Sequence, residues 1–155
     1  MTFTRMFKIL QAVYSKYSGK YALPGQTKYM SLDEFVEMVG QAGVVDDTFG
    51  AREIGPLFNL SMMTCKNELD SDRHLNMTHV EFIEAIGRLA DKLTNLPDLI
   101  PEITPQHPSK LDKKIESLLL ILCRNCLNKN NGEVLEKQVR KAIEEEMGQV
   151  KATLV

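Results

Sequence analysis

The chain has 155 residues, of which 43% are hydrophobic and 26% are charged, a composition typical of globular proteins. Its formal net charge of −2, with lysine and arginine scattered along the chain, argues against a nucleic-acid-binding protein, because phosphate binding requires a basic surface. The longest apolar run, Leu118 to Cys123, is much shorter than the roughly 20 residues that a membrane-spanning helix needs.

Two helices are predicted from apolar residues at three-or-four spacing. The first is followed by Gly19 as a stop signal, and its apolar residues are Phe3, Phe7, Leu10, Val13, Tyr14 and Tyr17. The second is expected to run through Ile54, Phe58, Met62, Cys65 and Leu69. The loop after the first helix, residues 18–29, contains no carboxylate.

A short motif occurs twice. Residues 30–40 read M-S-L-D-E-F-V-E-M-V-G, and residues 77–87 read M-T-H-V-E-F-I-E-A-I-G. A spaced self-match of this kind indicates a duplicated supersecondary unit.

Each copy carries the signature of a helix start. Ser31 precedes Glu34 by three residues, and Thr78 precedes Glu81 by three residues. This is the spacing of a capping box, in which the hydroxyl accepts from one unpaired amide and the glutamate accepts from another. We therefore expect a helix to begin after Ser31 and after Thr78.

Two further pairs of equivalent residues flank these caps. Phe35 and Phe82 directly follow the glutamates and should point inward at equivalent places. Met30 and Met77 directly precede the caps, in stretches too short to form strands alone. Each stretch needs a β partner, and the other copy can supply one.

The duplicated arrangement resembles the EF-hand superfamily over about residues 3–92. In that family an apolar residue at loop position eight pairs with its sister loop, and a glutamate at position twelve binds calcium. Met30 and Met77 match position eight, and Glu34 and Glu81 match position twelve. The resemblance implies an all-α fold with an EF-hand-like pair of helix-loop-helix units joined by a short two-strand bridge.

The two loops differ in the ligands that they offer. Calcium takes six to eight oxygen atoms, so the first loop, which lacks carboxylates, is expected to bind none. In the second loop, residues 70–81, the resemblance implies four ligands: Asp70, Asp72, Asn76 and Glu81. Position five is His74, a poor calcium ligand, and position six is Leu75 where the family has a glycine at a strained turn. We favour a relic loop without an ion; a calcium site is the alternative.

The chain after the second motif divides into a linker and a helical segment. Proline recurs at near-regular intervals, which favours an extended linker: Pro97, Pro101, Pro105 and Pro108. We therefore predict three parts, namely an EF-hand-like pair over 1–94, a proline-rich linker over 95–108 and a C-terminal helical segment over 109–155.

The C-terminal segment is predicted to be a helical hairpin. Ser109 is expected to cap a helix from Lys110 to about Lys129, which is apolar nearly all round in its middle. After a predicted turn at residues 128–132 (N-K-N-N-G), a last helix should cover residues 133–147. A helix that is apolar on several sides needs another apolar surface, either the groove between the hands or a separate protein chain.

Cys123 and Cys126 form a C-x-x-C near the end of this apolar helix. A redox pair of this kind sits at a helix N-terminus after a strand, so we interpret both thiols as core residues. Zinc would require two more ligands, and the other candidates show no paired spacing: Cys65, His74, His79 and His107. Sparse, odd-numbered cysteines favour a reducing, cytoplasmic location.

No nucleophile elbow, phosphate loop or dinucleotide fingerprint is present, so we expect no enzyme activity. Methionine adapts well where a surface must accept a helix. We expect four methionines to line a partner groove: Met6, Met38, Met62 and Met63.

The sequence predicts two alternative functions. The first is a non-catalytic protein-protein interaction or structural module, without a cofactor, that holds its own helix or a partner's helix permanently in its groove. The second is a calcium-responsive sensor that uses the loop 70–81. The resemblance also implies a setting, because similar EF-hand-like segments occur in ciliary and flagellar assemblies. We therefore expect a larger complex of the cilium, the axoneme or the cytoskeleton.

Overall fold

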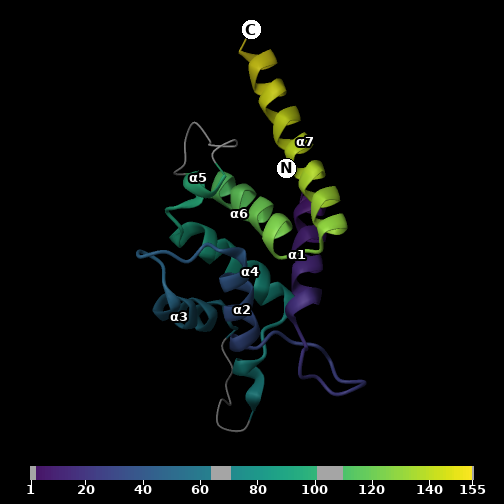
Figure 1. Ribbon diagram of the computed structural model, residues 1–155, viewed down its shortest axis with the longest axis vertical. Helices are drawn as coiled ribbons and strands as arrows, with labels where there is room; N and C mark the ends of the chain where they lie inside the picture. Colours follow the sequence, from purple (N-terminus) through teal and green to yellow (C-terminus); the bar gives the residue numbers. More distant parts are fainter. Residues whose placement is uncertain (1–2, 64–70, 101–109, 155) are drawn as a thin grey trace.

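The computed structural model describes residues 3–63, 71–100 and 110–154, and within these ranges the chain is helical (Figure 1). Two helix-loop-helix segments come first, and a pair of C-terminal helices packs onto them. The elements in chain order are α1 (Phe3–Tyr17), α2 (Leu32–Ala42), α3 (Ala51–Ser61), a 3-10 turn η1 (Asp72–Leu75), α4 (His79–Lys92), α5 (Leu96–Leu99), α6 (Leu111–Asn125) and α7 (Lys129–Thr153).

Both predicted capping boxes are confirmed. The Glu34 carboxylate accepts from the Ser31 N–H at 2.8 Å, and the Ser31 hydroxyl accepts from the Glu34 N–H at 3.3 Å. Thr78 and Glu81 form the same pair of hydrogen bonds, at 2.8 and 3.4 Å. Helices α2 and α4 therefore begin where the two copies of the motif place them.

Met30 and Met77 join the two segments. Each donates its backbone N–H to the carbonyl of the other at 2.9 Å, which makes an antiparallel pair. The pairing is an isolated bridge, and among the described residues no strand extends from it. The Tyr14 hydroxyl of α1 donates to the Met77 carbonyl at 2.9 Å. Both methionine side chains are fully buried, so the bridge lies within the core.

Helix α6 supplies a large part of the core, as its apolar circumference predicts. Residues 118–122 are at most 3% exposed, and α6 packs against α1, α2, α4, α5 and α7. Two polar contacts fix its position: Lys114 Nζ donates to the Asp91 carbonyl at 2.9 Å, and Asn125 Nδ2 donates to the Ala42 carbonyl at 2.8 Å. The covering surface is therefore the helix-loop-helix segments of the same chain.

The turn predicted at residues 128–132 is wrong, because α7 already begins at Lys129. Gly132 is buried, and a β-carbon at this position would collide with the Cys123 carbonyl of α6. The glycine therefore permits close approach of two helices. In the sequence, a glycine with this packing role looks the same as a glycine in a turn. The helix also extends beyond the predicted end at residue 147, to Thr153.

Two other predicted boundaries need correction. Helix α3 ends at Ser61, so Met62 lies just beyond it, and Cys65 and Leu69 lie outside the described residues. Part of the predicted linker is helical, since Leu96–Leu99 form α5 with Pro97 in its first turn, where the missing N–H costs nothing. Leu96 and Ile100 are buried and hold this turn against the core. Residues 101–109, including Ser109, lie outside the described ranges, and Lys110 precedes α6.

Ion pairs connect α6 with α7. Glu136 accepts from Arg124 at 2.9 Å and from Arg140 at 2.8 Å, and Lys113 lies 3.5 Å from Glu146.

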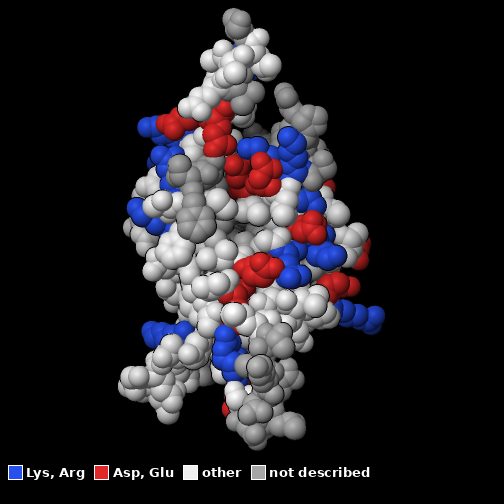
Figure 2. Space-filling model, turned by 180° about the vertical axis from the view of Figure 1, so that it is seen from behind, with Lys and Arg blue, Asp and Glu red and all other residues white. Residues whose placement is uncertain are grey.

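Acidic and basic side chains are intermixed on the face shown in Figure 2. The C-terminal end of α7 projects beyond the other helices (Figure 1). None of the helices within the described ranges has the length and hydropathy of a membrane span.

Candidate functional site

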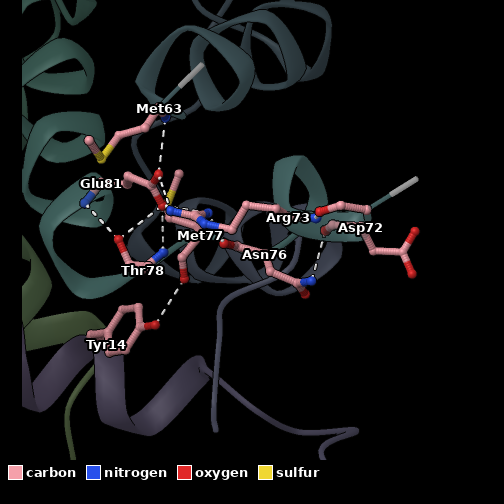
Figure 3. Close-up of polar contacts among 9 residues, drawn as sticks. Tyr14, Met63, Asp72, Arg73, Asn76, Met77, Thr78 and Glu81 are labelled. Carbon is pink, nitrogen blue, oxygen red and sulfur yellow. Dashed lines mark hydrogen bonds and ion pairs between the residues drawn. The ribbon is translucent and has the colours of Figure 1, made fainter. Parts of the chain in front are cut away.

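Glu81 is the polar centre of the second helix-loop-helix segment. Its side chain is 1% exposed and accepts hydrogen bonds from three directions (Figure 3). One carboxylate oxygen accepts from the Met63 N–H at 3.0 Å, just after α3. The other accepts from the backbone and the hydroxyl of Thr78, at 2.8 and 2.9 Å. The glutamate therefore ties the end of α3 to the beginning of α4.

The third direction is filled by a cation of the chain itself. The guanidinium of Arg73 lies 2.7 Å from Glu81 Oε1 and 3.3 Å from Oε2. The same guanidinium donates to the Asn76 carbonyl at 2.8 Å. These are the oxygen atoms of loop positions seven and twelve, which would be ligands in the alternative of a calcium site. Arg73 therefore occupies the place between them.

Asp72, another predicted ligand, does not join this cluster. Asp72 is exposed, and its carboxylate points away from Glu81 (Figure 3). Its backbone carbonyl accepts from Asn76 Nδ2 at 2.8 Å, so the Asn76 amide is also engaged locally. Asp70 lies outside the described residues. Within the described part of the chain, no three histidine, cysteine, aspartate or glutamate residues are grouped as a metal site would require.

The loop does not place Leu75 in the strained turn that the family has at position six. Residues Asp72–Leu75 form a 3-10 turn, which begins after Ser71, whose hydroxyl accepts from the Arg73 N–H at 3.1 Å. Across the described ranges, positive φ angles occur only at glycines. Because the calcium-binding loop needs a sharp turn at position six, this backbone conformation differs from that of a calcium loop.

The contacts of Glu81 determine its protonation. Burial alone would raise the pKa of its carboxyl, but the hydrogen bonds from Arg73, Thr78 and Met63 outweigh burial and lower the pKa to about 2. The carboxylate is therefore charged at neutral pH, and the partly exposed Arg73 guanidinium balances its charge.

We expect Glu81 to make the stability of the fold depend on pH in the acid range. A carboxyl with a pKa of about 2 in the folded chain and 4.5 in the unfolded chain stabilises fully above pH 4.5 and loses that contribution as the pH falls toward 2. A difference of this size corresponds to roughly 3 kcal/mol. Urea unfolding of the parent and of Glu81→Gln, at about pH 5 and about pH 3, measures this contribution.

The variant should be less stable than the parent near pH 5 and should lose less stability on acidification. Glu84→Gln is the matched control, because Glu84 lies on the same helix with a side chain that is 58% exposed. Equal pH dependence in the parent and in Glu81→Gln would contradict the role of the buried carboxylate.

Glu34 repeats this arrangement in the first segment without a guanidinium. Its side chain is buried, and its two oxygens accept from the Lys20 N–H at 2.7 Å and from the Ser31 N–H at 2.8 Å. Lys20 follows the end of α1 as Met63 follows the end of α3. Each glutamate therefore joins two helices through backbone amides.

The four methionines predicted to line a groove lie in different environments. Met38 is fully buried, and Met6 and Met62 are partly buried against the core. Met63 is 65% exposed, and its backbone N–H donates to Glu81. Helix α6 covers apolar surface of α1, α2 and α4.

The two described cysteines, Cys123 and Cys126, are free and buried thiols. Burial raises the pKa of Cys123 to about 12 and also raises the pKa of Cys126. Cys126 Sγ lies 3.7 Å from the Met38 carbonyl. The thiolate form, which redox and metal chemistry use, is thus disfavoured at both positions.

Sequence reasoning did not identify Arg73 as part of the site. The available signal was a long basic side chain at loop position four, within reach of an acid at position twelve. Comparisons with models of known protein families, with curated proteins and with solved structures found no match. The site is therefore interpreted from its own geometry.

Proposed function

We propose that this chain is a non-catalytic protein-protein interaction or structural module built on a degenerate pair of EF-hand-like units. The observation that carries the proposal is the Arg73 guanidinium bound to Glu81 and to the Asn76 carbonyl. A fixed internal cation balances the carboxylate that an ion would otherwise bind. The second unit then keeps one conformation whether calcium is present or absent.

The EF-hand-like assignment is supported by the equivalence of the two units. Glu34 and Glu81 both cap the exiting helix and both accept an amide from the end of the entering helix. The Met30–Met77 pair joins the units at matching positions. Local hydrogen bonds of this kind hold each pair of helices together without an ion.

Helix α6 supports a constitutive, structural role. It lies against α1, α2 and α4 with its central leucines buried, as a helix bound in an apolar groove would. We propose that α6 is a permanent internal ligand of the paired units. From the family resemblance alone, we place the module in a larger assembly such as a ciliary or cytoskeletal complex in the cytoplasm.

Calorimetric titration with calcium tests the proposal against a calcium sensor that uses residues 70–81. We expect no binding heat with the parent chain, because the Arg73 guanidinium already occupies Glu81. Glu81→Gln is the matched variant, and Arg88→Gln, which loses only an exposed pair with Glu84, is the control. Heat in the parent and in Arg88→Gln that vanishes in Glu81→Gln would establish the sensor instead.

A further inference from the structure

The two equivalent glutamates differ in one respect. Glu81 is 2% exposed and bound by the Arg73 guanidinium, whereas Glu34 is 3% exposed and bound by two backbone amides. Within the described ranges, no lysine or arginine side chain forms an ion pair with Glu34. An ionised carboxylate offers about four acceptor positions, so each oxygen of Glu34 retains capacity for another donor.

A cavity of about 470 Å³ opens onto Glu34. Its lining residues also include Tyr21 and Tyr29, together with Gln26, Thr27, Ser31 and Asn76. This volume lies within the range of small-ligand sites, and the lining residues include two tyrosines and a buried acid. A planar cation fits such a wall, because a guanidinium donates to a carboxylate through its edge and stacks on aromatic rings through its face.

Neither lysine of this loop is among the lining residues of the cavity. Lys20 pairs with Glu37 at 2.7 Å, outside the cavity wall. The aliphatic part of Lys28 lies against Gly19, and Lys28 is not part of the described cavity wall either. The only charged side chain among the described lining residues is that of Glu34.

We propose that this cavity binds an arginine side chain presented by a partner polypeptide, with its guanidinium against Glu34. The second unit provides the internal precedent, because there the chain's own Arg73 binds the equivalent Glu81. Tyr21, with 83% of its surface exposed, and Tyr29 would cover the aliphatic part and the face of the guest. The cavity is separate from the surface that α6 covers. An absence of arginine binding would therefore leave the proposed structural role of α6 unaffected.

The test is an NMR titration of the full chain with N-acetyl-arginine-N′-methylamide, with the neutral citrulline analogue as the matched ligand. We expect saturable shifts at Glu34, Tyr21 and Tyr29 with the arginine compound. The citrulline analogue should bind at least about tenfold more weakly than the arginine compound, because it lacks the charge that strengthens the hydrogen bonds. Calcium added to the same sample should leave these resonances in place.

Two variants keep the test independent of folding effects. Glu34→Gln should weaken arginine binding about tenfold or more, and Tyr21→Ala, at an exposed position, should weaken it several-fold while the remaining spectrum is retained. Glu37→Gln is the control and should bind like the parent. Equal binding of both analogues, shifts elsewhere on the chain, or undiminished binding by folded Glu34→Gln would overturn the proposal. Shifts at Glu34 caused by calcium and not by arginine would replace it with a cation site.

Discussion

Truncation after Asn95 is expected to leave residues 1–95 unable to persist as a soluble monomer. The deletion removes α6, whose residues 118–122 are almost completely buried against the rest of the chain. Burial of five such side chains contributes roughly 10 kcal/mol. That is comparable with the whole stability of a small domain, so the exposed surface should drive association or unfolding.

Size-exclusion chromatography and binding of an apolar dye measure this result. The matched control is truncation after Gly148, which removes only the projecting end of α7, where the described side chains are exposed. This shorter deletion should leave the elution volume and the thermal midpoint unchanged. A monomeric fragment 1–95 with unchanged stability and no dye binding would mean that α6 does not dock on the paired units.

Substitution of either motif phenylalanine by alanine is expected to cost about 3 to 5 kcal/mol of unfolding free energy. Phe35 and Phe82 are both fully buried, as their equivalent places after the caps predicted. Phe35 contacts the Phe58 ring at a centroid distance of 5.8 Å, and Phe82 contacts the Tyr14 ring at 5.5 Å. Each truncation would leave a cavity between helices of the two units and reduce these ring contacts.

Denaturant unfolding at neutral pH measures both variants. Val36→Ala and Val80→Ala are the controls, since these valines lie on the same helices and are 40% and 71% exposed. The controls should change stability by less than about 0.5 kcal/mol. Phenylalanine variants with the same midpoints as the valine variants would contradict the burial of these rings.

The features that the sequence predicts best are those set by residues close together in the chain. Ser31 with Glu34 and Thr78 with Glu81 satisfy each other across one helical turn, so their spacing alone identifies the caps. The pairing of Met30 with Met77 followed from the duplication of the motif. The apolar circumference of α6 predicted that the helix is buried. It could not show whether the covering surface belongs to the same chain or to a partner protein.

The features that were missed depend on contacts across the fold. Arg73 lies in a 3-10 turn and pairs with Glu81, eight residues further along the chain, a contact that no local spacing rule indicates. Gly132 was interpreted as a turn because its packing partner, the Cys123 carbonyl, lies on another helix. Helix α5 is stabilised by burial of Leu96 and Ile100, which outweighs the local preference of a proline-rich stretch.

Amide hydrogen exchange of α6, with and without calcium, tests most directly whether this helix fills the groove permanently. Amides of residues 118–122 should be protected to the same degree as those of Phe82 to Leu89 in α4, because both sets are buried in one core. Calcium should change neither set, since Arg73 holds the second unit in its present conformation. Exchange of α6 much faster than that of α4, or loss of α6 protection on addition of calcium, would contradict this account.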